Sequence, residues 1–397
     1  MISERAKSLK PSPTLALAAK AKELAAQGHD VISLSVGEPD WDTLECAKKA
    51  GIEAIQKGQS KYTPSNGIIE LRKAIAAQTS KDIGVTYTAD DVTVSTGGKF
   101  VIFAALQMVL DPGDEVIIPA PYWVSYPVMT ELAGGKPKIA VCDEKVNFKL
   151  TADILRKSLS PKTKVLILNS PSNPTGLMYT REELSALAKV LADYPRVLIL
   201  SDDIYNRLVF EGELAPHILH VAPELKPRTL VMNGASKTYA MTGWRVGWAM
   251  GPAEWVKAMT NYQSQSVSQA ATMAQWATLK AIEAGAAELK TSLVELKTRR
   301  DRGLKMLRAI PGMKVSDPDG AFYFWPDVRA YLGKRHAGTE LKTASDFSNA
   351  LLADKKVAVV PGIEFGLEGY VRLSFALKED RMAQAFDRIQ SFVGALT

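Results

Sequence analysis

The stretch NGASKTYAMTGWRVGW, residues 233–248, places two cations in unusual surroundings. Lys237 follows Ser236 among small residues, and Arg245 precedes Gly247 by two positions, next to tryptophan. An apolar run lies on either side, TLVM before the stretch and WAM at its end. Two solvated surface cations would fit this pattern, and so would a reactive amine with an anion-binding group. Other parts of the sequence must decide between these interpretations.

Composition limits the classes of function. The chain has 397 residues, which predicts two domains, or one large domain with a smaller one. Lys and Arg number 49 against 43 Asp and Glu, and they are scattered, so no nucleic-acid surface is expected. Two cysteines indicate no disulfide framework and a reducing compartment, so we expect a cytoplasmic protein.

The sequence gives no indication of a membrane partner. Its longest strongly apolar run, residues 100–110, is too short to span a bilayer. The N-terminal MISERAKSLKPSP lacks the apolar core of a secretory signal. We therefore expect neither membrane insertion nor secretion.

Strands and helices alternate through the middle of the chain, which predicts an α/β fold with a parallel sheet and right-handed crossovers. The expected strands lie in DDVTVS (90–95), DEVIIPA (114–120), KTKVLILNS (162–170), RVLILSDD (196–203) and TLVMNGAS (229–236). The expected helices lie in GKFVIFAALQMVL (98–110), SYPVMTELAG (125–134) and REELSALAKVLADY (181–194).

The two ends of the chain have a different pattern. We expect a helix over 13–27, a long helix over 281–310, short strands in AFYFWP, VAVVPG and YVRLSFA, and a closing helix from Lys378. This pattern predicts a large middle domain and a smaller domain built from both ends. The predicted division is 1–40 and 290–397 for the smaller domain and 41–289 for the larger one.

Unusual residues follow the predicted strands, and ligands of open parallel sheets bind at the carboxyl ends of strands. The first strand leads to Thr96-Gly97-Gly98-Lys99 ahead of a helix. Such glycines either form a tight turn or bring backbone N–H groups onto a phosphate. The spacing is not the G-x-G-x-x-G of dinucleotide sites, which argues against a nicotinamide dehydrogenase.

Four further strand ends carry polar or aromatic residues, namely Trp123, Asn173, Asp202 and Lys237. Taken singly, each has an ordinary explanation, such as core packing for Trp123 or a helix cap for Asp202. Taken together with Arg245, they supply what a pyridoxal phosphate site needs. In such a site a lysine forms the Schiff base, an aspartate pairs with the pyridinium nitrogen, and N–H groups with an arginine bind the phosphate.

From about residue 5 to the C-terminus the chain resembles the class I, fold-type I pyridoxal-phosphate aminotransferases. It is most similar to the bacterial aspartate aminotransferase branch, which includes bifunctional aspartate/prephenate enzymes. The resemblance implies a large domain with a mostly parallel central sheet flanked by helices, plus a smaller α+β domain. It rests on SLSVGEPDWDT (33–43), KYTPSNGIIELR (61–72), STGGK (95–99), DPGDEVIIPAPYWVSYP (111–127), NSPSNPTG (169–176), SDDIY (201–205), the opening stretch, PDGAFYFWP (318–326) and VRLSFA (371–376).

The resemblance implies a role for each ring-binding residue. Lys237 holds the pyridoxal phosphate covalently and acts as the general base. Asp202 contacts the pyridine nitrogen, Tyr205 and Asn173 bond the ring's phenolic oxygen, and Trp123 stacks on the ring. Lys237, Asp202 and Tyr205 are thereby the implied catalytic residues.

The phosphate is implied to bind Ser236, Arg245 and the backbone near Gly98. Tyr62 is implied to reach the phosphate of the neighbouring subunit, which makes the protein a homodimer with shared sites; without the resemblance, Tyr62 would be read as a surface residue. The animal-type enzymes have a serine where this chain has Gly234, so one phosphate hydrogen bond of those enzymes is in doubt here.

The resemblance also implies substrate-binding residues. Arg372 and Asn173, with the Gly37 backbone, grip the α-carboxylate in a pocket that includes Trp123. Lys99 either meets the distal carboxylate or contacts only the phosphate. Lys10 and Thr14 lie at the pocket entrance. Lys10 matches a position linked to prephenate use, and its alternative is a solvated N-terminal charge.

The implied activity is amino-group transfer between L-aspartate and 2-oxoglutarate, with glutamate and prephenate or arogenate as further candidate substrates. The alternatives are an aminotransferase for aromatic amino acids, alanine or kynurenine, or a C–S lyase of the same fold. A regulator with an aminotransferase-like domain is disfavoured, because the similarity begins within the first ten residues. The four histidines lie outside the motifs and show no metal-ligand spacing, so no metal is expected.

Overall fold

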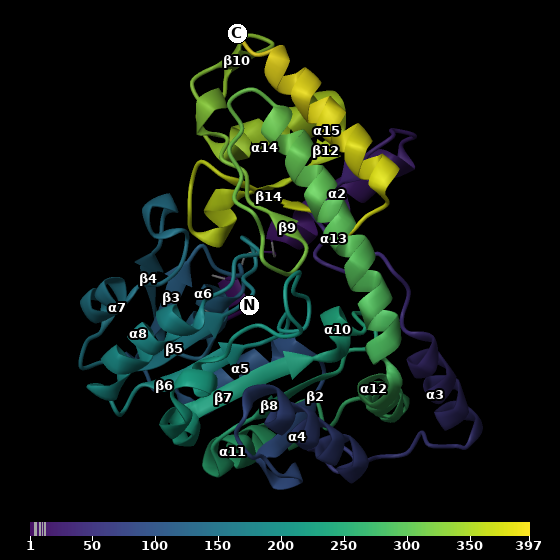
Figure 1. The fold of residues 1–397 in the computed structure, drawn as a ribbon, viewed down its shortest axis with the longest axis vertical. Helices are drawn as coiled ribbons and strands as arrows, with labels where there is room; N and C mark the ends of the chain where they lie inside the picture. Colours follow the sequence, from purple (N-terminus) through teal and green to yellow (C-terminus); the bar gives the residue numbers. More distant parts are fainter. Residues whose placement is uncertain (4–5, 8, 10, 12) are drawn as a thin grey trace.

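A seven-stranded sheet in the order β2-β8-β7-β6-β5-β3-β4 forms the centre of the larger of two lobes (Figure 1). The computed structural model describes residues 1–3, 6, 7, 9, 11 and 13–397. β8 runs antiparallel to both neighbours, and the other adjacent strands pair in parallel. The strands are β2 (Val92–Ser95), β3 (Glu115–Ala120), β4 (Lys136–Val141), β5 (Thr163–Asn169), β6 (Leu198–Asp202), β7 (Thr229–Gly234) and β8 (Gly247–Met250).

The five predicted strands and the mostly parallel sheet are confirmed, and the sequence prediction missed β4 and β8. β4 is an edge strand whose exposed and half-buried residues lack a continuous apolar run. β8 has only four residues and directly follows the turn that contains Arg245. Neither strand therefore gave a clear periodic signal.

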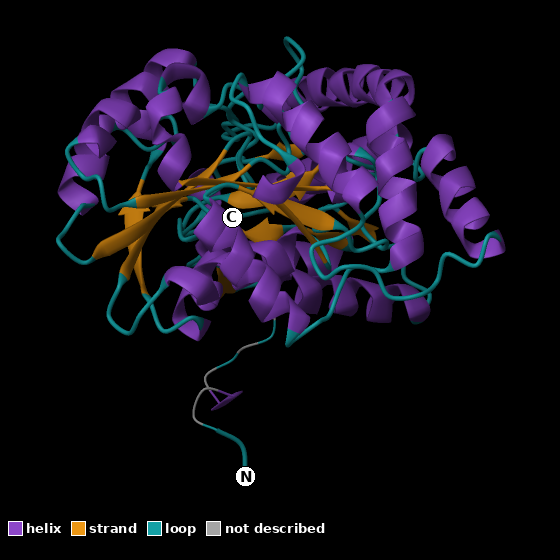
Figure 2. Cartoon of the chain, turned by 90° about the horizontal axis from the view of Figure 1, so that it is seen from below, coloured by secondary structure: helices purple, strands orange, loops and turns teal. Residues whose placement is uncertain are grey.

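Helices cover both faces of this sheet (Figure 2). Alternate residues of β3 explain why, since Ile117 joins one buried apolar cluster while Val116 and Ile118 join another on the opposite face. The helices of this lobe are α3 (Glu45–Gln56), α4 (Ile69–Ile83), α5 (Gly98–Val109), α6 (Tyr126–Leu132), α7 (Ala152–Ser158), α8 (Arg181–Ala192), α9 (Ile218–Val221), α10 (Ala235–Thr238), α11 (Ala253–Ser264) and α12 (Thr272–Ala284), with the short 3₁₀ helices η1 (Ala89–Asp91), η2 (Glu144–Val146) and η3 (Pro223–Arg228).

Both ends of the chain build the smaller lobe, as predicted. β1 (Ile32–Ser33) pairs in parallel with β12 (Val357–Ala358), so the N-terminal segment joins the C-terminal one. The other elements are α2 (Pro13–Ala26), α13 (Ala286–Ala309), α14 (Ala344–Lys355), α15 (Glu379–Gly394), β9 (Tyr323–Phe324), β10 (Arg335–His336), β11 (Thr339–Glu340), β13 (Val360–Pro361), β14 (Val371–Ser374), η4 (Arg329–Tyr331) and η5 (Gly362–Phe365). A large α/β lobe with a smaller α+β lobe is the fold class that the sequence predicts.

The long helix predicted over 281–310 is two helices, because the chain turns at Gly285 between α12 and α13. A Cβ at Gly285 would lie 2.5 Å from the Ala281 oxygen and 2.5 Å from Leu44 Cδ1, so this tight junction requires glycine. α13 then runs from the larger lobe into the smaller one (Figure 1). It crosses the predicted 289/290 boundary as one continuous helix, and the division at residues 40 and 289 stays a prediction.

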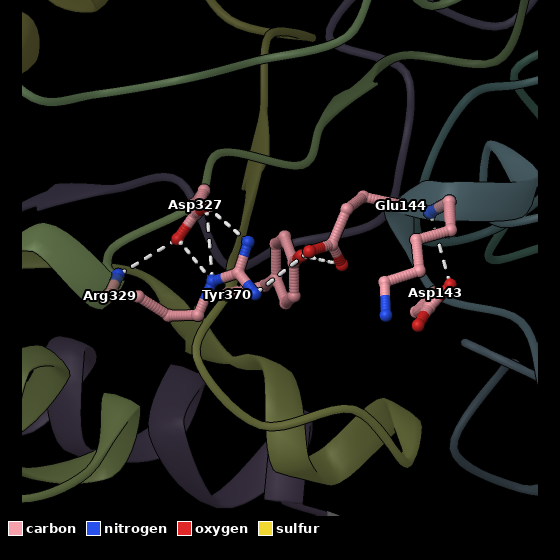
Figure 3. Close-up of polar contacts among 6 residues, drawn as sticks. Asp143, Glu144, Asp327, Arg329 and Tyr370 are labelled. Carbon is pink, nitrogen blue, oxygen red and sulfur yellow. Dashed lines mark hydrogen bonds and ion pairs between the residues drawn. The ribbon is translucent and has the colours of Figure 1, made fainter.

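An ionic cluster also links the two lobes (Figure 3). Glu144, from η2 of the larger lobe, accepts hydrogen bonds from Arg329 Nη1 at 3.0 Å and from the Tyr370 hydroxyl at 2.8 Å. Asp327 holds the guanidinium of Arg329 from the other side. Hydrogen bonds from the Glu144 backbone N–H, Tyr370 and Arg329 lower the pKa of Glu144 to about 2, so the contact is ionic at neutral pH.

Within the described residues, no helix has both the length and the apolar character needed to cross a membrane.

Candidate active site

A cavity of about 480 Å³ lies where the carboxyl ends of the strands meet the smaller lobe. It brings together nearly all the residues predicted from the sequence. Those that line it are Thr14, Gly37, Gly98, Lys99, Trp123, Asn173, Asp202, Tyr205, Ser236, Lys237, Arg245 and Arg372. Tyr62 does not line the cavity of its own chain and is 91% exposed. Lys10 lies outside the described residues.

Asp202, the last residue of β6, is buried at the floor of this cavity. Its Oδ2 accepts a hydrogen bond from the Tyr126 hydroxyl at 2.6 Å, and its Oδ1 accepts one from the Ile204 N–H at 3.2 Å. No cationic side chain of the described residues forms an ion pair with it. Burial raises the pKa of Asp202 to about 7. A ligand that presents a cationic donor would therefore satisfy this carboxylate.

The neighbouring Asp203 faces away from the cavity. Its Oδ1 accepts a hydrogen bond from Ser201 Oγ at 2.6 Å, and His217 Nε2 lies 3.5 Å from its Oδ2. Burial raises the pKa of Asp203 to about 7 as well, but this side chain does not line the cavity. Of the two acids in SDDIY, Asp202 is therefore the one available to a ligand.

Lys237 projects into the cavity from α10, the short helix that follows β7. Its Nζ donates a hydrogen bond to the Gly37 oxygen at 2.5 Å. Burial, with the charges of Arg372 and Arg245, lowers the pKa of Lys237 to about 8, although Glu38 and Asp202 act to raise it. An amine with this pKa is partly unprotonated near neutral pH, which a nucleophile or general base requires.

The part of the cavity around α5 is suited to an anion. α5 begins at Gly98, and the first N–H groups of a helix have no acceptor within it. Gly97 has a φ of 90°, and a Cβ there would lie 2.5 Å from Arg245 Nη2. A Cβ at Gly247 would lie 2.4 Å from the Gly98 nitrogen. Small residues surround Arg245 because the backbone and the guanidinium approach so closely, and the buried Ser236 adds a hydroxyl.

Gly234 also has little room for a side chain. A Cβ there would lie 3.1 Å from the Val246 oxygen and 3.2 Å from Ile204 Cδ1. The serine that animal-type enzymes carry at this position would have to displace one of these neighbours. The contacts around Gly234 therefore accord with the departure noted in the sequence.

Arg372 comes to the cavity from β14 of the smaller lobe. Its Nη1 donates to Asn173 Oδ1 at 3.0 Å and its Nη2 to the Ser35 oxygen at 2.6 Å. Its buried Nε has no partner within the described part of the chain, and burial lowers the pKa of the guanidinium. A fixed guanidinium with a donor to spare is suited to binding a carboxylate.

The ammonium of Lys99 lies 5.2 Å from the centroid of the Trp123 ring. Burial and the charge of Arg245 lower the pKa of Lys99. Lys99 and Arg245 both line the cavity, so both cations are available to an anionic ligand. The geometry thus leaves open both predicted roles of Lys99, distal carboxylate or phosphate.

Two tyrosines in the cavity were missed by the sequence analysis. Tyr126 donates to Asp202, and the hydroxyl of Tyr323 lies 2.8 Å from that of Tyr205. Tyr323 lies in the apolar AFYFWP and Tyr126 at the start of an apolar helix, where an aromatic residue predicts core packing. Only their hydroxyl groups could have indicated a site, since a buried Tyr O–H usually finds a partner.

The chain is similar to known aminotransferases over nearly its whole length. The family model for class I and II aminotransferases matches residues 29–389. A probable aspartate/prephenate aminotransferase of Rhizobium leguminosarum bv. phaseoli is 46% identical over 388 residues, 98% of this chain and 97% of that protein. The aspartate aminotransferase of Rhizobium meliloti superposes with a TM-score of 0.96 at 41% identity, covering 100% of both chains. That of Thermus thermophilus with maleate has a TM-score of 0.92 at 40% identity, covering 99% of both.

The buried Asp202 predicts an unusual dependence of stability on pH in the ligand-free protein. Its pKa is about 7 when folded against 3.8 as a model compound, so the folded state binds more protons between these pH values. The contribution of Asp202 to stability should therefore fall as pH rises from about 4 to 8. Asp202→Asn should raise the free energy of unfolding at pH 8 by up to about 4 kcal/mol and change it little at pH 4.

Urea denaturation of ligand-free protein across this pH range measures the effect. The exposed Asp387 offers a control, because Asp387→Asn should leave the pH dependence unchanged. A loss of stability in Asp202→Asn at pH 8 would contradict the interpretation of Asp202 as an uncompensated buried charge.

Proposed function

The chain belongs to the class I and II aminotransferases, and from this membership we propose that it is a pyridoxal 5'-phosphate enzyme that transfers the amino group between L-aspartate and 2-oxoglutarate. The name of the Rhizobium leguminosarum relative supports prephenate as a further substrate. The observation that carries the proposal is that Lys237 and Asp202 line the same cavity. One is an amine of lowered pKa, and the other is a buried carboxylate with no ion-pair partner among the described residues.

The chemical groups around the cavity fit the ring of pyridoxal phosphate. Asp202 would receive the protonated ring nitrogen, which supplies the missing cation. Lys237 Nζ would hold the cofactor covalently, and the Trp123 ring would stack on it. Tyr205 and Asn173 would bond the ring's phenolic oxygen. All five side chains line the same cavity, which supports this assignment.

The anion-binding part fits the phosphate group. The N–H groups at the start of α5, the Ser236 hydroxyl and the Arg245 guanidinium provide donors of the kind that bind phosphate. A Cβ at Gly97 would clash with Arg245, and a Cβ at Gly247 would clash with the Gly98 backbone, so glycine is needed at both positions. The close approach of backbone to anion that a phosphate needs is therefore sterically possible.

Pyridoxal phosphate, when bound, withdraws electrons from the substrate's α-carbon and stabilises negative charge there. The chain's own residues supply the proton transfer. Lys237 Nζ would take the proton from the substrate's α-carbon and give it to the cofactor carbon bonded to the transferred nitrogen, and its pKa of about 8 leaves a fraction of the amine unprotonated at neutral pH. The negative charge of Asp202 keeps the proton on the ring nitrogen. The lowered pKa of Lys237 and the ion pair of Asp202 with the ring nitrogen would thus both favour removal of the α-proton.

Arg372 is the proposed receptor for the substrate's α-carboxylate, with Asn173 and the Gly37 backbone beside it. It is held by two hydrogen bonds and keeps Nε unpaired within the described residues. Lys99 is the proposed partner of a second carboxylate. The Thermus thermophilus relative carries maleate, a dicarboxylate, which supports a substrate with two acid groups.

We also propose a homodimer in which Tyr62 completes the partner's site. Tyr62 lies in the turn segment ahead of α4 and is almost fully exposed in the single chain. An isologous two-fold interface would place two such tyrosines at two sites.

Both cysteines, Cys46 and Cys142, are unpaired, which supports the expected reducing, cytoplasmic location.

The proposed function predicts where the cofactor is attached. Borohydride reduction of the enzyme loaded with pyridoxal phosphate should label one peptide, the one that contains Lys237, as measured by mass spectrometry. Lys237→Ala should still bind pyridoxal phosphate without covalent labelling, because the ring and phosphate contacts remain, and it should not turn over. A label on any other lysine of the wild-type enzyme would contradict the proposed mechanism.

Lys99→Ala should discriminate between substrates. If Lys99 binds the distal carboxylate, kcat/KM for aspartate should fall by the equivalent of about 2–5 kcal/mol, while that for alanine should fall far less. The exposed Lys22 gives a control, and Lys22→Ala should change neither value. Equal losses for aspartate and alanine would instead assign Lys99 to the phosphate.

Mixed dimers test the role of Tyr62. Tyr62→Phe on one chain and Arg245→Ala on the other should load both lesions into one site and leave the second with wild-type affinity for pyridoxal phosphate. A dimer with both changes on one chain and none on the other should instead show two weakened sites. The reverse pattern in calorimetric titrations would show that Tyr62 serves its own subunit.

A further inference from the structure

Tyr126 contacts both Asp202 and Trp123. Its hydroxyl donates to Asp202 Oδ2 at 2.6 Å in a fully buried hydrogen bond. Its ring meets Trp123 edge to face, with the ring centroids 5.3 Å apart and the planes at 82°. Tyr126 is 2% exposed, and it lines the cavity. Tyr126 therefore links the buried carboxylate of Asp202 to the ring of Trp123.

The position of Tyr126 is fixed by the protein and needs no ligand. It is the first residue of α6, its N–H donates to the Trp123 oxygen at 3.0 Å, and its own oxygen accepts from Thr130 Oγ1 at 2.9 Å. Its ring is part of the apolar cluster that includes Ile102 and Met129. The hydroxyl is consequently held at one place relative to β6.

The direction of the hydrogen bond follows from the chemistry of the pair. Burial and the charge of Asp202 raise the pKa of Tyr126 well above its usual value, so the phenol keeps its proton and donates. A donor to a carboxylate favours the ionised form and opposes burial, which favours the neutral form. Tyr126 thus lowers the pKa of Asp202 while burial raises it.

We propose that Tyr126 is a positioning residue for the reaction: its hydroxyl keeps the Asp202 carboxylate ionised and oriented, and its ring sets the tilt of Trp123. This inference rests on the proposed function, in which Asp202 pairs with the ring nitrogen of pyridoxal phosphate. Among the described residues, the other donor to the Asp202 carboxylate is the Ile204 N–H, at the longer distance of 3.2 Å. Loss of the Tyr126 hydroxyl would leave this backbone bond to hold the charge.

A second buried tyrosine provides the matched control. The Tyr179 hydroxyl accepts a hydrogen bond from the Leu150 N–H at 3.0 Å, and Tyr179 does not line the cavity. Tyr126→Phe and Tyr179→Phe each remove one buried, hydrogen-bonded hydroxyl. A purely structural role would make the two variants behave alike at the active site.

The experiment follows the ring nitrogen in the holoenzyme with ¹⁵N-labelled pyridoxal phosphate, whose NMR shift reports protonation. We expect Tyr126→Phe to lower the pH at which this nitrogen loses its proton by about one to two units, as loss of a hydrogen bond to a charged group predicts. The kcat should fall about ten- to a hundredfold with KM for aspartate changed only a few-fold. Tyr179→Phe should match the wild type in the ring-nitrogen midpoint, in kcat and in KM for aspartate.

Replacement of Tyr126 by 3-fluorotyrosine gives an independent test, because a more acidic phenol is a stronger donor of nearly the same shape. It should raise the pH at which the ring nitrogen loses its proton, and it serves even if Tyr126→Phe folds poorly. An unchanged ring-nitrogen midpoint in both Tyr126 variants would overturn the role of Tyr126. A wild-type ring nitrogen that is unprotonated at pH 7 would instead overturn the proposed partnership of Asp202 with the cofactor.

Discussion

The burial of an aspartate carboxylate with no ion-pair partner among the described residues is the constraint on which this account of the site depends. In the described part of the chain, the carboxylate accepts hydrogen bonds from the Tyr126 hydroxyl and the Ile204 N–H, and burial favours its neutral form. Folding tolerates such a group when a bound cation repays the cost. The lowered pKa of Lys237 has the same origin, since burial disfavours its charge as well. Burial thus disfavours the charged forms of two groups that meet at the site of the proposed proton transfer.

The site also depends on both lobes. Arg372 belongs to β14 of the smaller lobe, yet it bonds Asn173, which follows β5 of the larger lobe. The Tyr323 hydroxyl from the smaller lobe similarly meets that of Tyr205. The continuous helix α13 and the Glu144 cluster hold the lobes in this arrangement. Any motion of one lobe against the other would therefore move the proposed carboxylate receptor relative to the proposed cofactor site.

The sequence predicted most of this site because polar residues directly after apolar strands are anomalous. Asn173, Asp202 and Lys237 were found by that signal, and the structure brings them into one cavity. Tyr126 and Tyr323 could not be found in the same way. An aromatic residue in an apolar segment predicts core packing, and its role depends on which group its hydroxyl meets in three dimensions.

The errors in the fold prediction arise where the local sequence pattern is too short or too continuous to reveal the boundary of an element. β8 follows the turn with Arg245 and has only four residues, and Gly285 interrupts a helical pattern that reads as continuous.

Infrared difference spectroscopy tests the central claim most directly. In ligand-free protein at pH 6, wild type should show protonated carboxyl absorption from both Asp202 and Asp203. The Asp202 component should be missing from Asp202→Asn, and it should disappear from wild type when pyridoxal phosphate binds. Carboxyl absorption that is the same in Asp202→Asn, or that pyridoxal phosphate leaves unchanged, would contradict the account of Asp202 as a buried acid that ionises when its cation binds.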